Sequence, residues 1–364
     1  MLHMPIGQRT RRFSRSPSVL LAACLAVVLA SGRSSLTADD AKPTKALPAD
    51  LTLVPEDAAA FLCLQVGPYW NGAEAESLKK ITQAHPLVLT WETKDFDKQI
   101  GLNMAEIERF VLVVPEFKAK GNTAAWIFTT GKPFNRDKVL EAIVPEPKEM
   151  RIGAIKYFIS DKRPEGVQIV NKQTLVMSTA TGLRTFLSRP TGAKEGALRQ
   201  AVGAAADKHL LIAGMVPSVF LPAVKNSGDK GKAFVPLFEA KSWQITADAA
   251  KELRINLRLD FANEAAAKEG QKALQGIVEP LIDFCTFAEK GMNDFYKREA
   301  DKYKGITELS SRYPKLFENA RAALKDFKSE QNGSTVQGTL RIKTDEPVTS
   351  FVLLLSMMPR EAKK

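Results

Sequence analysis

The chain has 364 residues, of which 45% are hydrophobic and 26% are charged, and its formal net charge is +11. This balance is typical of a packed protein and excludes a disordered chain, while the length is enough for two ordinary domains. The 52 basic residues are interleaved with 41 acidic ones, so we interpret the positive charge mainly as a contribution to solubility.

The first forty residues have the composition of an export signal. A basic start without acidic residues is followed by twelve apolar residues at 19–30 and then by small polar residues. This order predicts a secretory signal peptide and cleavage zone over residues 1–38, followed by an Ala-, Lys- and Pro-rich linker at 39–48. Removal of residues 1–30, which contain four Arg, lowers the net charge to +7. We therefore expect an exported protein, periplasmic or extracellular.

Two alternatives for this leader stay open. The apolar run is shorter than the roughly 20 residues that span a bilayer, so an uncleaved membrane anchor is the less favoured one. Residues 21–24 (LAAC) resemble a lipobox, which would place a lipid on Cys24, but six further apolar residues follow that cysteine. Arg11 and Arg12 resemble a twin-arginine signal, although an ordinary basic region explains them as well.

The folded chain is expected to begin near Leu51, with a buried strand at 58–66. Helical spacing of apolar residues predicts helices at 75–84 and 87–100, with Gly101 as the residue that ends the second. Asn103 and Glu106 form a capping-box pattern before a strand that begins at Ile107. Residues 107–143 then predict a strand, a Gly-Asn turn, a second strand and an Asn-capped helix. Two or three short strands over 150–179 and a helix at 181–188 complete this part.

The same order of elements returns later in the chain, which is the strongest internal signal in the sequence. Residues 241–274 again predict two strands and a helix, residues 208–216 match the strand at 59–67, and residues 340–351 match 175–186. Matches in the same order indicate an internal duplication. We predict an α+β fold with two related halves, 49–205 and 206–359, each a mainly antiparallel sheet with helices packed on one face. A basic tail follows at 360–364.

The second half contains a helical insertion at about 262–329. Apolar residues recur there at three- and four-residue spacing between Ala273 and Phe295. Pro280 predicts a kink or a break after Glu279, and Pro314 predicts the first turn of a further helix. Residues 348–358 are apolar nearly all round, so we expect a buried closing helix that is too short to span a membrane.

Residues of the types that act in catalysis or bind metal ions are few and lie far apart in the sequence. His85 lies at a helix boundary, and His209 opens an apolar strand. Cys63 and His209 could be imagined as a nucleophile and its base, but nothing in the sequence places the two within hydrogen-bond distance. No zinc-binding motif or GxSxG elbow occurs. The loop at 228–232 lacks the spacing of a phosphate-binding loop, and Asp95 and Asp97 point apart on a helix. We therefore assign no catalytic, cofactor-binding or metal residue.

Two further groups of residues have structural interpretations. Cys63 alternates within a strand and Cys285 lies on an apolar helical stripe, so two buried thiols are favoured over the disulfide that export would permit. A basic cluster near residue 300 is interleaved with Glu299 and Asp301, which indicates a solvated helix face and no nucleic-acid partner. Its members are Lys297, Arg298, Lys302 and Lys304, with Tyr296 and Tyr303.

Three passages carry a resemblance to other proteins: LPADLTLVPEDAAAF at 47–61, GLNMAEIERFVLVV at 101–114 and LDFANEAAAKEGQKAL at 259–274. On these the chain resembles a group of exported bacterial proteins of uncharacterised function, over most of its mature length. The resemblance implies export and the strand–helix architecture, with no functional residue to carry over.

A full-sized core without a catalytic constellation indicates a non-enzymatic protein with a binding, scaffolding or assembly role in the bacterial envelope or outside the cell. An envelope protein or an anionic polymer is the expected kind of partner, and membrane contact is expected only through an uncleaved leader. A hydrolase of envelope polymers with dispersed active-site residues is one alternative. A membrane-tethered form, held by its leader or by a lipid on Cys24, is another.

Overall fold

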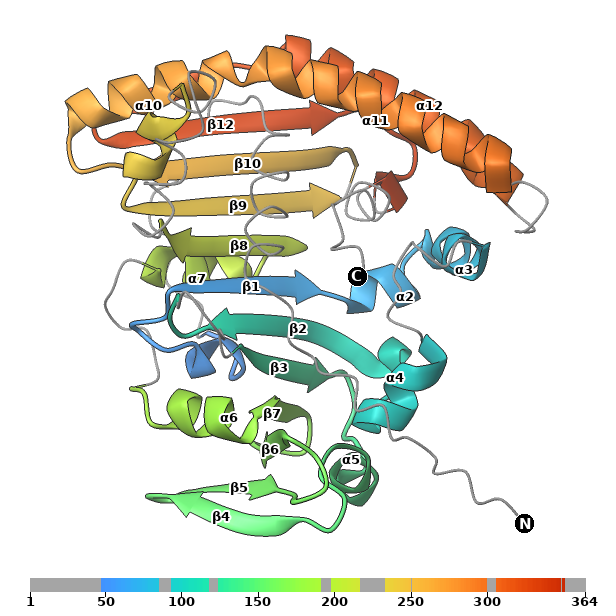
Figure 1. The fold of residues 1–364 in the computed structure, drawn as a ribbon, viewed down its shortest axis with the longest axis vertical. Coiled ribbons are helices and arrows are strands. Elements are labelled where there is room, and N and C mark those ends of the chain that lie inside the picture. Colours follow the sequence, from blue (N-terminus) through green and yellow to red (C-terminus); the bar gives the residue numbers. More distant parts are fainter. Residues whose placement is uncertain are drawn as a thin grey trace, which may run out of the picture.

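The computed structural model describes residues 47–84, 93–117, 124–190, 198–216, 233–249, 251–299, 306–347 and 349–350. Their strands form one sheet of twelve, in the order β11-β12-β10-β9-β8-β1-β2-β3-β7-β6-β5-β4, and every neighbouring pair is antiparallel (Figure 1). The predicted α+β class and the mainly antiparallel pairing are therefore confirmed.

The strands of the first half are β1 (Ala60–Gln65), β2 (Ile107–Val114), β3 (Ala125–Thr130), β4 (Lys148–Ile152), β5 (Ile155–Ile159), β6 (Glu165–Ile169) and β7 (Thr174–Thr179). Those of the second half are β8 (Leu210–Met215), β9 (Ser242–Ala249), β10 (Leu253–Asp260), β11 (Ser329–Asn332) and β12 (Thr335–Ile342). The α-helices of the first half are α2 (Gly67–Asn71), α3 (Ala75–Ala84), α4 (Thr93–Ile100), α5 (Arg136–Ile143), α6 (Ala180–Leu187) and α7 (Arg199–Ala205). In the second half they are α10 (Glu264–Gly276), α11 (Val278–Glu299) and α12 (Ile306–Lys325). The described residues also form three short 3-10 turns: η1 (Leu51–Leu53), η2 (Met104–Glu106) and η4 (Val235–Glu239).

Within the sheet the two halves join through the pairing of β1 with β8, and the same order of strands repeats outward from that pair. From β1 the sheet continues through β2, β3, β7 and β6, and from β8 it continues through β9, β10, β12 and β11. In each half a hairpin is followed by an insertion, after which a strand pairs with the outer edge of the hairpin: β7 pairs with β3 after α5 and β4–β6, and β12 pairs with β10 after α10–α12 and β11. The two expected sheets are thus one continuous sheet, because β1 and β8 pair with each other and leave no open edge between the halves.

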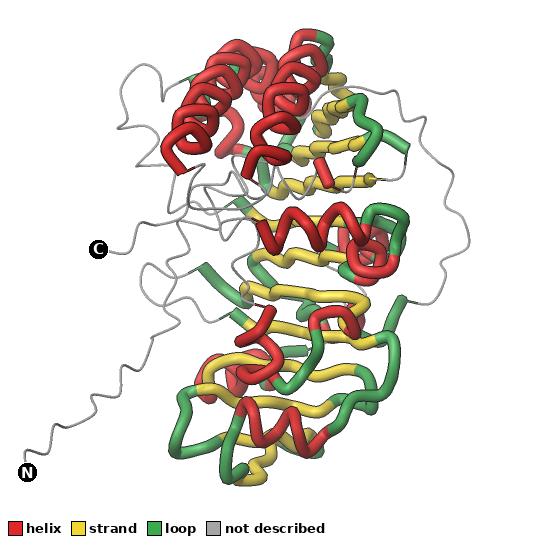
Figure 2. Tube along the Cα trace, turned by 90° about the vertical axis from the view of Figure 1, so that its right-hand side faces the viewer, coloured by secondary structure: helices red, strands yellow, loops and turns green. Residues whose placement is uncertain are grey.

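Burial along the strands explains where the helices lie. Every residue of β2 from Phe110 to Val114 is buried, whereas β10 alternates buried and half-buried positions. A continuous apolar strand needs cover on both faces, and an alternating strand needs it on one. Accordingly α4 and α5 cover one face of the first half, and η1, α6 and α7 cover the other. The expectation of helices on one face holds for α10, α11 and α12 in the second half and is wrong for the first half (Figure 2).

Most of the predicted elements appear near their expected bounds. Asn135 and Asn263 cap α5 and α10, and their side-chain oxygens accept backbone N–H bonds. Gly101 ends α4 at φ 76°, and its N–H donates to the carbonyl of Asp97. Residues 148–179 form four strands, one more than the upper expectation. The first part of the helix predicted at 87–100 lies outside the described residues.

The two proline-based predictions are wrong in detail. The helix breaks at Ile277, and Pro280 lies in the first turn of α11, where its missing N–H leaves no hydrogen bond unmade. Pro314 lies inside α12, which begins eight residues earlier at Ile306. Of the predicted closing helix, the described residues show a first turn at Pro347, Thr349 and Ser350, and the remainder lies outside them.

Gly270 fixes how α10 sits on the sheet. A Cβ at this position would lie 2.2 Å from the Cζ atom of Phe261, which is itself buried at the end of β10. The absence of a side chain therefore lets the tip of the aromatic ring approach the helix backbone. This contact sets the depth at which the helical insertion meets the second half of the sheet.

Asp50, just before η1, forms a buried ion pair with the sheet. Both carboxylate oxygens of Asp50 accept from Nη1 of Arg109 on β2, at 2.9 and 3.1 Å, and Thr129 on β3 donates a third bond at 3.1 Å. The side chains of Asp50 and Arg109 are only 3% and 13% exposed. The pair ties the N-terminal turn η1 to the sheet, which gives Asp50 a structural role.

Candidate functional site: the groove along α11

Helix α11 has one apolar side in the core and a second one in solvent. Leu281 is buried, and Cys285, Ala288 and Met292 pack beside it against the core of the second half. On another side of the helix Phe284 is 47% exposed and Phe287 is 75% exposed. Large aromatic side chains that stay exposed on a helix whose other side is packed in the core indicate a surface for binding another molecule or segment.

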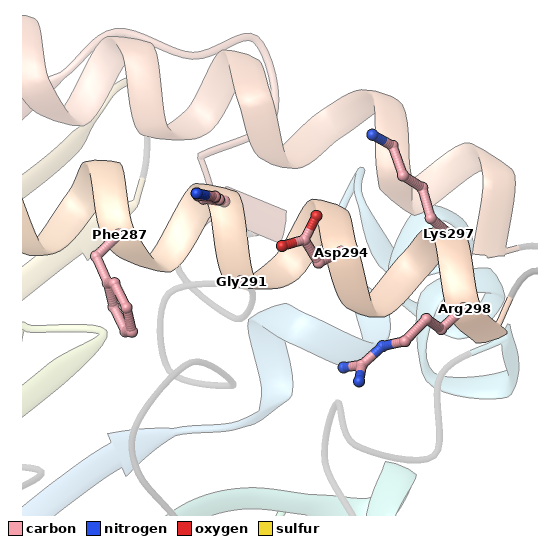
Figure 3. A pocket seen from close by; sticks show the side chains of 6 residues that line it. Phe287, Gly291, Asp294, Lys297 and Arg298 are labelled. Atoms are coloured by element: carbon pink, nitrogen blue, oxygen red, sulfur yellow. The ribbon is translucent and has the colours of Figure 1, made fainter.

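A groove of about 710 Å³ runs beside Phe287 (Figure 3). Its described lining is Phe287, Lys290, Gly291, Asp294, Lys297 and Arg298, all on α11. Gly291 follows Phe287 by one helical turn, and no atom lies within 4 Å of where its Cβ would be. The missing side chain therefore leaves open space between the phenylalanine and the charged residues.

The hairpin partner α12 fixes the position of α11. The carboxylate of Glu289 accepts a charged hydrogen bond from Arg321, and both side chains are about one quarter exposed. A different side of α12 packs into the core of the second half through Tyr313, Leu316 and Phe317. The groove is thus presented by a helix that is anchored on its neighbour and on the sheet.

Charged side chains surround the apolar part of the groove. Lys290, Lys297 and Arg298 are exposed, and Asp294 lies among them, as Figure 3 shows for three of these four. Long basic side chains can lay their aliphatic stems on an apolar ligand while their charges stay in water. The described lining of the groove therefore suits an apolar segment with polar ends.

In the second half, the face of the sheet that the helices do not cover has a row of polar side chains. Asn256 on β10 donates to the hydroxyl of Thr246 on β9 at 3.1 Å and accepts from Thr339 on β12 at 2.8 Å. Next to this ladder, Asp260 accepts from Ser242, Thr335 and Arg258. These groups satisfy one another across the strands, so they stabilise the sheet and present no unpaired set for a ligand.

Cys63 and His209, considered above as a nucleophile and its base, lie on the same face of the central strands, but their side chains form no hydrogen bond with each other. The Sγ atom of Cys63 donates to the carbonyl of Ala205, and burial raises the pKa of this thiol to about 12. His209 Nδ1 instead accepts the N–H of Ala249 at 3.3 Å and lies 3.2 Å from Asp248 Oδ1. A thiol held protonated by burial is a poor nucleophile, so the structural interpretation of both residues stands.

Cys63 and Cys285, the cysteines of the described part, are free. They belong to cores on opposite faces of the sheet, which explains why the two form no disulfide with each other. Cys63 is fully buried as expected, whereas Cys285 is half-buried under α12 and its thiol pKa is raised mainly by desolvation. The expectation of two buried thiols is therefore confirmed for Cys63 only.

The other candidates divide between charged surface and undescribed segments. Asp97 binds Lys138 on α5 at 2.7 Å, as a surface carboxylate does. Lys297 and Arg298 lie exposed near the end of α11, at the groove. Outside the described residues lie His85, Cys24, the loop at 228–232, Lys302, Tyr303 and Lys304, and the side chains of Asp95 and Tyr296 are not described either. Among the described residues no group of three or more His, Cys, Asp or Glu is placed to hold a metal ion.

Sequence reasoning missed Phe284 and Phe287 as surface residues. The predicted apolar stripe packs against the core of the second half from Leu274 to Met292, whereas the side chain of Phe295 lies outside the described residues. Phe284 follows Leu281 by three residues and so fits the spacing of the stripe, and only Phe287 lies off it. None of the described helices combines the length and the apolarity needed to cross a membrane.

Comparison with known proteins gives little. No protein-family model matches the chain, and no curated protein matches it. A crystal structure of TP0453, crystal form I, is similar at a TM-score of 0.41 and 12% identity, covering 87% of this chain and 100% of that chain. Similarity at this level says nothing about activity, ligand or partner.

Proposed function

We propose that the protein is an exported, non-catalytic binding protein of the bacterial envelope or the extracellular space, and that the groove along α11 is its contact surface. The exposure of Phe287, 75% on a helix that is otherwise anchored in the core, is the observation that carries the proposal. The occupant that suits this groove is an apolar polypeptide segment of an envelope protein, because the lining offers an aromatic wall, open space at Gly291 and flanking charges.

Site-specific crosslinking in the native host tests the binding role. A photoreactive amino acid replaces Phe287 in the groove, and a matched control replaces Glu318, which is exposed on α12. We expect a discrete heteromeric product from position 287 that is absent at 318, is identified by mass spectrometry and disappears when Gly291→Trp fills the open space. Equal products from both positions, or none from either, would contradict the proposal.

Export is tested separately by sequencing the N-terminus of protein purified from the host. A mature start within 31–39 agrees with the expected cleavage zone. A start at residue 1 would support the anchored form instead, and a blocked start at Cys24 the lipidated form. Each of these results leaves the groove and its proposed partner class unaffected.

A further inference from the structure

The sheet ends at two hairpins, and their outer edges differ. At one end β11 has four residues, and the carbonyl of Ser329 on it accepts a bond from the side chain of Gln271 on α10 at 2.8 Å. At the other end, within the described part of the chain, no strand pairs with the outer side of β4. An unpaired edge strand is a template for a further strand.

The β4–β5 hairpin shows which backbone groups of β4 face outward. Its two-residue turn begins at Gly153, which has a φ of 57°, and Ile152 before the turn lies opposite Ile155 after it. Residues that flank such a turn bond to each other, and bonded pairs recur at every second position of an antiparallel ladder. The N–H and C=O groups of Glu149 and Arg151 therefore point to the open edge.

The side chains of β4 differ between its two faces. Met150 and Ile152 are half-buried against the core that η1, α6 and α7 cover. On the other face, Glu149 forms ion pairs with Arg151 at 3.2 Å and with Lys156 on β5 at 3.3 Å, and all three side chains are more than 40% exposed. Charges on an edge strand discourage pairing. Those at 149 and 151 have opposite signs, however, so they repel a second copy only where the register sets like signs together.

Two copies of β4 fit together in one antiparallel register. With the two-fold axis through Met150, Glu149 of each copy lies opposite Arg151 of the other, and each of these pairs exchanges both of its backbone N–H···O bonds. An axis through Glu149 or through Arg151 would instead set like charges opposite each other, which is destabilising. Pro147, just before the strand, has no N–H, so the ladder ends there on one side and at the turn on the other.

We propose that two copies of this chain associate through β4, antiparallel and with Met150 at the two-fold axis, so that their sheets become one continuous sheet across the contact. A strand pair of this length buries little surface, so the dimer is weak and depends on concentration. The contact lies at the opposite end of the sheet from α11 (Figure 1), and both α11 grooves stay free in the dimer. The proposal does not depend on the function proposed for the groove.

Cysteine crosslinking of the full chain tests the register. Met150 lies opposite its own copy in a pair without backbone bonds, where the Cα atoms are about 4.5 Å apart and within reach of a disulfide. Lys148, on the same face of β4, lies about 14 Å from its own copy. Under mild oxidation we expect Met150→Cys to give at least tenfold more disulfide-linked dimer than Lys148→Cys. Both chains keep Cys63 and Cys285, which contribute equally to the background.

Charge reversal tests the pairing of the side chains. Arg151→Glu and Glu149→Arg each set like charges opposite, and each should weaken the dimer at least tenfold in sedimentation equilibrium. An equimolar mixture of the two variants should recover the dimer, because one chain then has two negative charges on its edge and the other has two positive ones. The chain with both substitutions should also form dimers. Glu330→Arg makes a matched change on β11, where Glu330 is exposed, and should leave the dimer unchanged.

Other results overturn the proposal. A monomer at every concentration, equal disulfide yields from positions 150 and 148, or no recovery in the mixture would mean that β4 does not pair with its own copy. Loss of the dimer with Glu330→Arg alone would move the contact to β11, and a heteromeric disulfide at position 150 in the host would make a strand of another protein the occupant. If circular dichroism shows that Arg151→Glu does not fold, crosslinking at position 150 decides. Failure here leaves a heteromeric crosslink at position 287, and with it the binding role, intact.

Discussion

Leu62 lies opposite Ile212 in the antiparallel pair that joins the two halves, and positions 62 and 212 differ by 150 residues. The neighbouring pairs follow the same relation: Ala60 lies opposite Gly214, and Leu64 lies opposite Leu210. A shift of each residue by 150 exchanges these two pairs and leaves the Leu62–Ile212 pair unchanged. A local two-fold axis therefore passes through this pair, as expected if the duplicated halves associate through the same strand.

Gly270→Ala should destabilise the protein although alanine is the better helix former. The new Cβ would lie 2.2 Å from Phe261, and overpacking of this kind costs about 1–3 kcal/mol of unfolding free energy. Gly276→Ala at the end of the same helix is the control, because no atom lies within 4 Å of its Cβ position. It should be neutral or stabilising by up to about 1 kcal/mol in urea unfolding. Equal effects of the two substitutions would contradict the packing argument.

Arg109→Met should reduce the unfolding free energy by about 3–5 kcal/mol, because the carboxylate of Asp50 would remain buried with Thr129 as its remaining bonded side chain. Combining it with Asp50→Asn should cost less than the sum of the two single changes, since the second removes the uncompensated charge. Urea midpoints of the four chains give this coupling. Strict additivity would show that the pair does not act as a unit.

Alkaline pH should weaken the fold through Cys63. Burial raises the pKa of this thiol from 9.0 to about 12, so the unfolded chain loses its proton first. The stabilising contribution is complete below pH 9 and falls by about 1.4 kcal/mol per pH unit between 9 and 12. Cys63→Ala should flatten the pH dependence of urea unfolding over pH 9–10.5, and a slope identical to that of the parent would contradict the assignment.

Asn256→Ala should cost about 1–3 kcal/mol, because the substitution removes a bond to each of two buried hydroxyls, those of Thr246 and Thr339. Gln337→Ala on the same sheet face is a control and should change the unfolding free energy by less than about 0.5 kcal/mol. Thermal unfolding by circular dichroism is sufficient to rank the two. Equal losses would show that the ladder contributes nothing specific.

The repeated strand–strand–helix order could be read from the sequence because it rests on local signals. Asn135 and Asn263 cap their helices, and alternation defines β10. The single continuous sheet could not, because the pairing of β1 with β8 depends on contacts 150 residues apart. Helix α7 was missed because its N-cap is Leu198, which makes no side-chain capping bond, and its short Ala-rich sequence has no clear period.

The candidate site was less predictable than the fold. The buried stripe of α11 was visible as a period, but Phe284 and Phe287 read as ordinary apolar residues until the packing of α12 and of the sheet showed which side was already covered. The break between α10 and α11 was also placed incorrectly from the sequence. Pro280 was taken as the end of a helix, whereas the chain ends one helix at Gly276 and uses the proline to start the next.

The pairing of β1 with β8 has a consequence for biogenesis. Once the chain has emerged as far as residue 205, all seven strands of the first half are present, yet β1 has an unsatisfied backbone edge until β8 follows. An edge of this kind attracts the equivalent strand of a neighbouring nascent chain. Exchange of whole C-terminal halves between two molecules is thus the misassembly to which this architecture is most exposed, and crowding of unfinished chains would promote it.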